Sequence, residues 1–293
     1  MTEMDLDVNG VTLRVATWGE RAGPERTVML LHGITANNRT WFDFGPMLAG
    51  RGWFVLAPDL RGRGLSAKPD HGYGLAFHAN DALAICDRLD LPSVNLVGHS
   101  LGALVGLYLG GVYPDRLRRL VLVDAGGRLP ADTYQAIAPA LARLGELYPS
   151  LDAYLSAMRE STRFPWEPFG ARYYRYDAEV GADGATRSRV PKAAIAEEQA
   201  AAFFTRTDAL PEFVKAPTLI VRATEGLLGG ERGLILPREE ADRLLRAIAG
   251  SRLVEIPGVN HYTVVLTERF HGETIAFLEA ADPSEVRDNP FAS

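Results

Sequence analysis

Short apolar runs alternate with segments of helical spacing along most of this chain. The runs contain almost no polar residues, which is typical of strands buried on both faces of a sheet. They are Thr27 to Leu31, Trp53 to Ala57, Val94 to Val97, Leu120 to Val123, Thr218 to Val221 and Arg252 to Ile256. The segments of helical spacing are Trp41 to Ala49, Leu75 to Leu89, the stretch from Leu101 to Pro114, Pro237 to Ile248 and a last helix to about Ala280. This alternation predicts an α/β fold with a mostly parallel sheet flanked by helices.

The first residues follow a different pattern, in which apolar and polar positions alternate one by one. Two such runs, Asp5 to Val8 and Val11 to Trp18, are joined by Asn9-Gly10. This dipeptide between alternating runs is a strong signal of a β-hairpin. We therefore expect the chain to begin with a hairpin.

The strand–helix alternation stops at about Arg128 and resumes after about Pro211. No clear strand is predicted between them, only helix-like pieces separated by proline and glycine. The pieces are Asp132 to Leu147, Leu151 to Glu160 with Ser150 as N-cap, and Lys192 to Phe204. We expect a helical cap inserted between core strands, over their carboxyl ends, where such folds place their sites. The predicted division is 1–127 and 212–281 for the two parts of the core, 128–211 for the cap and 282–293 for a flexible tail.

Composition narrows the range of partners. The 293 residues are 47% hydrophobic and 23% charged, as in an ordinary globular protein with a sizeable core. The formal net charge of −6, without any run rich in Lys and Arg, argues against a nucleic-acid partner. No apolar run approaches the length of a membrane span, and the start MTEMDLDVNG lacks the apolar segment of a secretory signal. We therefore expect a cytoplasmic protein without a membrane partner, and the sequence predicts no oligomeric state.

The stretch Gly98-His99-Ser100-Leu101-Gly102 lies between an apolar strand and an apolar helix. It has the G-x-S-x-G pattern of a nucleophile elbow, in which small flanking residues permit a sharp turn and expose the serine hydroxyl. The backbone N–H of Leu101 falls in the first turn of the helix, where it is unpaired and can meet a developing oxyanion. The pattern predicts Ser100 as a nucleophile; the alternative is a glycine-rich helix start with a capping serine.

A serine nucleophile needs a general base, because a free hydroxyl is a poor nucleophile near neutral pH. His261 follows the last predicted strand and comes after the serine in the chain, as the order Ser…Asp/Glu…His requires. We therefore predict His261 as the base. The turn His32-Gly33-Ile34 follows another strand, and the N–H of Ile34 is predicted to complete an oxyanion hole with that of Leu101. His32 itself is expected to be structural.

Several stretches, taken together, resemble the α/β-hydrolase superfamily over about residues 4 to 281. They are LLHGIT, PDLRGRGLS, VGHSLG, LVLVDAG and GVNHYT. The cap and PDLRGRGLS are similar to the branch that contains epoxide hydrolases, haloalkane dehalogenases and capped carboxylesterases. The first two use aspartate where this chain has Ser100, so the resemblance implies ester-type chemistry without a metal or organic cofactor.

The acid of the triad is where the sequence departs from the usual family pattern. Members commonly carry aspartate at the position of Gly226, whose neighbour here is Glu225. Other members take the acid from the tip of the preceding core strand, which is the position of Asp124. We favour Asp124, because it directly follows four apolar residues and so lies at a strand tip; Glu225 remains the alternative, its longer side chain compensating for the shift.

These observations favour a serine carboxylesterase acting on a small apolar or aromatic ester or lactone. The alternatives with the same catalytic residues are a lactonase, a cofactor-free C–C hydrolase and a perhydrolase. A protein of another class, a hydrolase-fold carrier that binds a ligand without turnover, would need neither Ser100 nor His261. The cap is rich in aromatic residues, and some of them are expected to line the substrate pocket. They are Tyr134, Tyr148, Tyr154, Phe164, Trp166, Phe169, Tyr173, Tyr174 and Tyr176.

Overall fold

The fold is built around one eight-stranded sheet. The computed structural model describes residues 1–205 and 207–281, so the predicted tail lies outside the described residues. The strands of the sheet are β1 (Thr2–Val8), β2 (Val11–Trp18), β3 (Thr27–Leu31), β4 (Phe54–Pro58), β5 (Val94–His99), β6 (Leu117–Val123), β9 (Thr218–Glu225) and β10 (Arg252–Asn260). Their order is β1-β2-β4-β3-β5-β6-β9-β10. Only the pairs β1/β2 and β2/β4 are antiparallel, which confirms the mostly parallel sheet.

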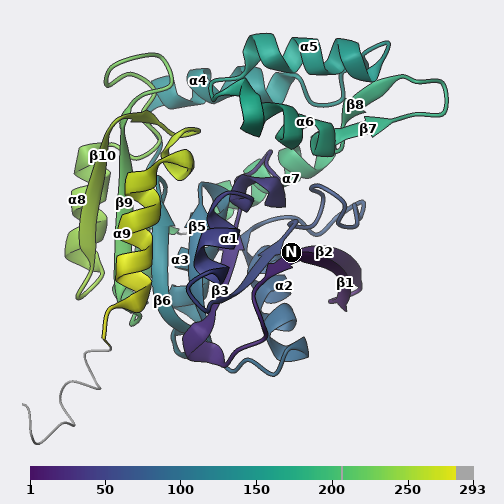
Figure 1. Cartoon of the computed structure of the whole chain (residues 1–293). Helices are drawn as coiled ribbons and strands as arrows, with labels where there is room; N and C mark the ends of the chain where they lie inside the picture. The colour runs from purple at the N-terminus through teal and green to yellow at the C-terminus, as the bar shows by residue number, and fades with distance from the viewer. Residues whose placement is uncertain (206, 282–293) are drawn as a thin grey trace, which may run out of the picture.

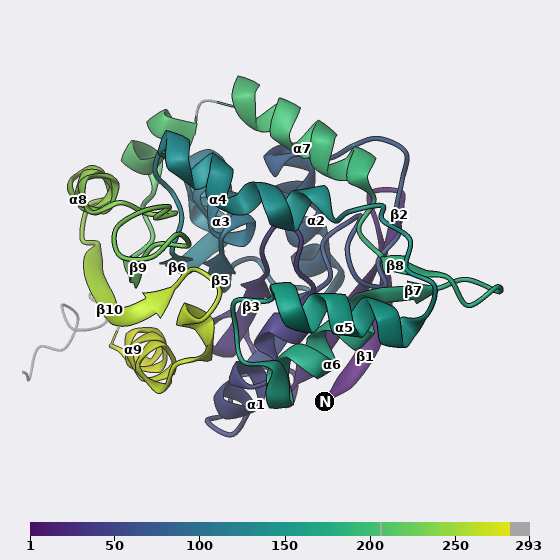
Figure 2. The same ribbon diagram turned by 90° about the horizontal axis from the view of Figure 1, so that it is seen from above.

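Helices cover both faces of this sheet (Figure 2). On one face lie α1 (Phe44–Ala49) and α9 (Glu268–Glu279), and on the other α2 (Leu75–Arg88), α3 (Leu101–Val112) and α8 (Arg238–Ala247). Successive strand residues point to opposite faces. In β3, Val28 and Leu30 therefore join the apolar cluster with α1 and α9, whereas Met29 and Leu31 join the cluster with α2, α3 and α8. The predicted three-layer α/β fold is confirmed.

The hairpin at the start of the chain has the predicted turn. Asn9 and Gly10 both have positive φ angles, 48° and 76°. These values match a type I′ turn, whose twist fits that of the flanking strands. The hairpin joins the sheet at its edge through β2 and β4.

The segment between β6 and β9 lies over one end of the sheet (Figure 1). Its elements are α4 (Ala131–Ala142), α5 (Leu151–Ser161), α6 (Ala171–Asp177), β7 (Ala178–Val180), β8 (Thr186–Ser188) and α7 (Lys192–Phe204). Short 3₁₀ helices lie at Pro24–Arg26, Asn38–Trp41, Pro114–Arg116, Thr207–Phe213 and Val264–Leu266, and a π-helical turn lies at Trp166–Gly170. The segment has an apolar cluster of its own, centred on Tyr154, Met158 and Tyr173. We refer to residues 128–211 as the cap.

Two expectations for the cap were wrong. It contains a strand pair, β7 and β8, which project away from the rest of the molecule as a hairpin (Figure 1). Each strand has only three residues, too few for a period of two to show in the sequence. The first helix ends at Ala142 rather than Leu147, and the chain then turns through Gly145 with a φ of 82°. The predicted N-cap of α5 is confirmed, since the Ser150 side chain accepts a hydrogen bond from the N–H of Ala153.

Candidate active site

Ser100 lies in a strained turn between β5 and α3. Its φ and ψ are 57° and −118°, a conformation that non-glycine residues rarely adopt. The close approach of strand and helix depends on two glycines: a Cβ at Gly98 would lie 2.2 Å from the carbonyl oxygen of Gly102, and one at Gly102 would lie 2.2 Å from that of Leu31. The structure therefore has the elbow geometry that the G-x-S-x-G pattern predicts, with the serine presented at the end of the strand.

His261 and Asp124 are joined by a hydrogen bond. His261 follows β10 and Asp124 follows β6, and the distance from His261 Nδ1 to Asp124 Oδ2 is 2.8 Å. Both side chains are buried. Asp124 has a φ of 50°, and its other carboxylate oxygen accepts from the N–H of Ala223 at 2.9 Å. A carboxylate fixed in this way holds the Nδ1–H tautomer of the imidazole, which leaves Nε2 available as a base.

Glu225 is not brought to His261. It is the last residue of β9, which runs four residues beyond the predicted end at Val221, and it pairs in the sheet with Asn260. The structure gives its carboxylate no hydrogen bond or ion pair within the described residues, and it does not line the cavity that contains Ser100. The longer strand holds Glu225 in the sheet, so its longer side chain does not compensate for the shift.

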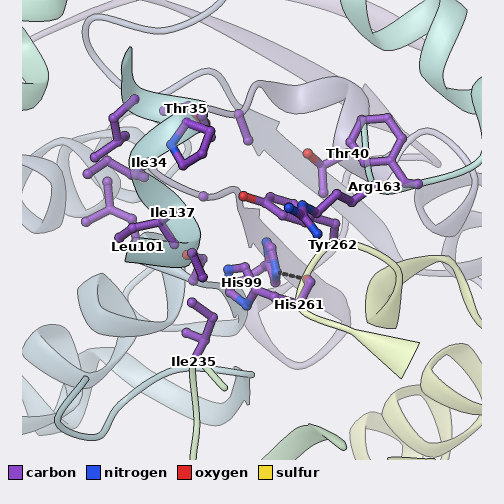
Figure 3. Close-up of a pocket in the computed structure, with 18 of the residues that line it drawn as sticks. Ile34, Thr35, Thr40, His99, Leu101, Ile137, Arg163, Ile235, His261 and Tyr262 are labelled. Atoms are coloured by element: carbon purple, nitrogen blue, oxygen red, sulfur yellow. Dashed lines mark hydrogen bonds between the residues drawn. The ribbon is translucent and has the colours of Figure 1, made fainter. Parts of the chain in front are cut away.

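The ring of His99 binds the backbone carbonyl of His261, a contact that the sequence did not reveal. The distance from His99 Nε2 to the carbonyl oxygen of His261 is 2.9 Å, and the ring centroids are 4.5 Å apart (Figure 3). Burial, followed by the neighbouring His261, holds the pKa of His99 well below its usual value. His99 is therefore neutral and donates its Nε2–H to this carbonyl. The only sequence signal was its place within the elbow, which a structural residue would share.

The two predicted oxyanion donors lie beside Ser100. A Cβ at Gly33 would be 3.2 Å from that of Ser100, so the turn containing Ile34 borders the serine directly. The N–H of Gly102 donates to the carbonyl of His32 at 3.1 Å, which ties this turn to the start of α3. Neither the N–H of Ile34 nor that of Leu101 donates to a described protein acceptor, and both residues line the cavity. Two free donors, one at the start of α3 and one in the turn after β3, suit an oxyanion.

His32 is structural, as expected. Its Nδ1 lies 2.9 Å from the carbonyl oxygen of Gly33, and its Nε2 accepts from the N–H of Leu60 at 3.0 Å. Burial lowers the pKa of His32 to about 3. The neutral side chain thus links the turn after β3 to the loop after β4.

A cavity of about 850 Å³ opens between the cap and the carboxyl ends of the strands. Ser100, His261, Ile34 and Leu101 line its core side. In Figure 3, Ile34, Leu101 and Ile137 lie on one side of His99 and His261, and Arg163 and Tyr262 lie on the other. The cap aromatics that line the cavity are Tyr134, Tyr148, Phe164, Phe169, Tyr173 and Tyr174. Tyr154 and Tyr176 instead bind Asp177 and Asp59 through their hydroxyl groups.

Two arginines of the cap interrupt the apolar lining. Arg143 lies 3.5 Å from Asp177, a carboxylate that also accepts from Tyr154 and Ser188. The Nε and Nη2 of Arg143 donate to no described group and are not fully enclosed by protein. Arg163 donates to the carbonyl of Leu227 and has no acidic partner among the described residues. Neither arginine carried a signal in the sequence, because nothing there shows which cap residues face inward.

Residues 1–205 and 207–281 show neither a metal-binding cluster nor a membrane-spanning helix. They contain no group of three or more His, Cys, Asp and Glu side chains arranged to hold a metal ion. None of their helices is both long and apolar enough to cross a membrane.

Comparisons with known proteins identify the family. A family model described as alpha/beta hydrolase fold matches residues 26–266. The 2-(acetamidomethylene)succinate hydrolase of Mesorhizobium japonicum is 31% identical over 265 residues, covering 88% of this chain and 87% of the relative. The serine hydrolase BPHL of Mus musculus is 28% identical over 272 residues, covering 89% and 80%.

Solved structures of two hydrolases have the same overall fold. That of an E-2-(acetamidomethylene)succinate hydrolase has a TM-score of 0.80 at 25% identity, covering 95% of this chain and 99% of the other. That of an enol-lactonase from Burkholderia xenovorans has a TM-score of 0.72 at 21% identity, covering 94% and 100%. The second likeness concerns the fold alone.

Proposed function

The chain is a hydrolase of the α/β-hydrolase family, and on that premise we propose that it cleaves carboxylic ester bonds through an acyl-enzyme on Ser100. The observation that carries the proposal is the hydrogen bond of 2.8 Å between His261 Nδ1 and Asp124 Oδ2, at the cavity that Ser100 lines. A histidine oriented by a buried carboxylate beside a strained, cavity-lining serine is the arrangement of nucleophilic catalysis.

The reaction proceeds in two halves. The Ser100 hydroxyl oxygen attacks the ester carbonyl while His261 Nε2 takes its proton, and the N–H groups of Ile34 and Leu101 donate to the resulting oxyanion. The intermediate collapses as His261 returns the proton to the departing alkoxide, which leaves as the alcohol. Water then attacks the acyl-enzyme with the same base, so that the acid leaves and Ser100 regains its proton. Asp124 stabilises the imidazolium in both halves.

Arg143 and Arg163 favour a more specific substrate, an ester or related acyl compound that carries a carboxylate. A guanidinium with free donors in a largely apolar cavity suits a carboxylate, which it can hold through two parallel hydrogen bonds. Glu146 and Glu198 also line the cavity, but Glu146 is exposed and bound to Tyr148, and Glu198 is paired with Arg63. The substrate named for the Mesorhizobium relative contains a succinate, a dicarboxylate, which supports the same choice.

A substrate panel tests this function against its alternatives. The panel contains neutral esters, hemiesters of dicarboxylic acids, lactones and a β-diketone, and each is followed by kcat/KM. We expect ester turnover that is lost in Ser100→Ala, with hemiesters preferred over neutral esters of equal length. Turnover confined to lactones or to the β-diketone would transfer the proposal to a lactonase or a C–C hydrolase. No turnover, together with saturable binding of the panel, would indicate a carrier.

A further inference from the structure

Three ionisable side chains from distant parts of the chain meet where the cap rests on the core. They are Arg63 in the loop after β4, His78 on α2 and Glu198 on α7, and all three are buried. Glu198 Oε2 accepts from Arg63 Nη2 at 2.7 Å and lies 2.9 Å from His78 Nε2. A buried ion pair of this kind is a weak source of stability, because the loss of hydration offsets much of the attraction.

The remaining donors of Arg63 reach the turn beside Ser100. Its Nε donates to the carbonyl of Ile34 at 2.9 Å, and its Nη1 donates to the carbonyl of Arg61 at 2.9 Å. All three nitrogens of one rigid guanidinium are thus engaged. The same group that binds Glu198 of the cap also holds Ile34, which supplies an oxyanion N–H in the proposed mechanism.

The turn itself is held through its carbonyl groups. Those of His32 and Gly33 accept from Gly102 and Ala36, both at 3.1 Å. Arg63 takes the third consecutive carbonyl, that of Ile34. The N–H of Ile34 lies in the same peptide plane as the carbonyl of Gly33, and Arg63 binds the carbonyl of the next peptide, so bonds on both sides of Ile34 fix its backbone. The N–H of Ile34 itself donates to no acceptor in the described chain.

The charges within the cluster are defined. Burial alone would raise the pKa of Glu198, but the hydrogen bond and charge of His78, followed by the charge and hydrogen bond of Arg63, lower it to about 2. Burial lowers the pKa of His78. The cluster therefore contains an ionised Glu198 carboxylate that accepts from the guanidinium of Arg63 and from Nε2 of His78. Glu198 Oε1 and His78 Nδ1 are buried without a hydrogen-bond partner in the described chain, so the cluster is retained at a cost in stability.

We propose that Arg63 is a positioning residue for the oxyanion hole and that Glu198 on α7 holds it in place, so that the hole is complete only when the cap is docked. The inference rests on the proposed serine chemistry at Ser100. It links the cap, which surrounds the substrate, to the group that stabilises the transition state. Arg63 acts through Ile34 and touches no reacting atom.

The test compares conservative changes in two buried ion pairs. Glu198→Gln neutralises the cap carboxylate. Arg63→Lys removes the guanidinium group, which binds Ile34, Arg61 and Glu198 at the same time. The matched control is Asp81→Asn in the neighbouring Arg61–Asp81 pair, which is also buried, with 2.6 Å between Arg61 Nη2 and Asp81 Oδ1. The side chains of this pair form no hydrogen bond to Glu198 or Ile34, and only the backbone carbonyl of Arg61 binds Arg63. Each variant is measured for kcat and KM on an activated ester, for inhibition by a boronic acid that forms a tetrahedral adduct, and for melting temperature.

The oxyanion interaction exists only in the tetrahedral state, so its loss lowers kcat and not the affinity for substrate. A misplaced or missing donor costs about 10²- to 10³-fold in kcat. We expect losses of about 10- to 100-fold for Arg63→Lys and about 3- to 30-fold for Glu198→Gln, with KM almost unchanged and boronate binding weakened in parallel. Asp81→Asn should change kcat by less than about twofold even where it lowers the melting temperature.

The inference would be overturned by near-native kcat in both Arg63→Lys and Glu198→Gln, or by an equal loss in Asp81→Asn. Labelling with a fluorophosphonate probe, which reacts with an activated serine, distinguishes failure of this inference from failure of the proposed function. A wild-type protein that the probe does not label would contradict the serine mechanism itself. Labelled wild-type protein with unaffected Arg63 and Glu198 variants would contradict the positioning role alone.

Discussion

The core and the cap contribute to the site in different ways. Each core residue of the candidate triad follows the end of a sheet strand: Ser100 after β5, Asp124 after β6 and His261 after β10. The sheet register therefore fixes their relative positions. The cap residues at the cavity come instead from short helices joined by irregular turns, as with Arg143 after α4 and Arg163 after α5. From this comparison we infer that the reacting groups belong to the core and that the cap selects the substrate, while Glu198 of the cap supports the core through Arg63.

The largest effect is expected from the core pair. Ser100→Ala and His261→Ala should each reduce kcat by about 10⁶-fold, because removing either member of a triad disables the unit. KM should change little, since the cap that binds the substrate is intact. Steady-state kinetics on an activated ester measure this, with circular dichroism as the control for folding. A Ser100→Ala protein with near-native kcat would end the proposal.

The second prediction compares the two carboxylates. Asp124→Asn removes the charge that stabilises imidazolium and favours the wrong tautomer of His261, so we expect a fall in kcat of about 10⁴-fold, as a comparable change produces in another serine hydrolase. Glu225→Gln is the matched control and should cost less than about twofold, because no described group depends on its charge. The reverse ranking would assign the acid to Glu225.

The third prediction concerns the cap alone. Arg163→Gln should raise KM about 10- to 100-fold for a hemiester, since a hydrogen bond to a charged group contributes roughly 1.5–3 kcal/mol. Turnover of a neutral ester of equal length should be unchanged. Arg187→Gln, an exposed cap arginine paired with Glu179 and away from the cavity, serves as the control. Equal losses on both esters would remove the carboxylate from the proposed substrate.

Limited proteolysis examines the same division at the level of the backbone. The turn from Gly181 to Ala185 joins two three-residue strands and projects from the cap, so a protease of low specificity should cut it first. The expected product is a nicked protein that keeps the core intact, seen by mass spectrometry. First cuts between Val94 and Val123 would show that the core is the less stable region.

The smallest effect is a pH dependence of stability. Burial lowers the pKa of His32 to about 3 and that of His99 well below its usual value. The unfolded chain therefore takes up protons at these histidines below about pH 6.5 while the folded chain does not, so stability falls as pH falls. Asp59, whose pKa burial raises to about 6, opposes this as a single group. The melting temperature should be lower at pH 5.0 than at pH 7.5; an equal or higher value would contradict the neutral state of the histidines.

The sequence predicted the parts of the site that depend on local patterns. Ser100 lies within one strand–turn–helix unit, and Gly98 and Gly102 are required there by contacts within that unit and with the adjoining strand. The prediction of His261 as the base rests on chain order alone. The choice of Asp124 over Glu225 was harder, because it depends on where β9 ends and on contacts between residues 137 positions apart.

What the sequence did not predict depends on packing between distant segments. Arg63 belongs to PDLRGRGLS, which gave no sign of its link to Glu198, 135 positions later. The inward position of Arg143 and Arg163 follows from how α4 and α5 pack, and neither helix shows this in its pattern. The strands β7 and β8 were missed because three residues are too few for a periodicity.

The most direct test of the central claim is the covalent state of Ser100. The protein is mixed with an activated ester, quenched with acid during turnover, digested and examined by mass spectrometry. We predict an acyl group on the peptide that contains Ser100, present in wild type and in excess in a variant whose deacylation is slowed, and absent in Ser100→Ala. Ester turnover without an acylated Ser100, or an acyl group on another residue whose loss abolishes turnover, would contradict the account.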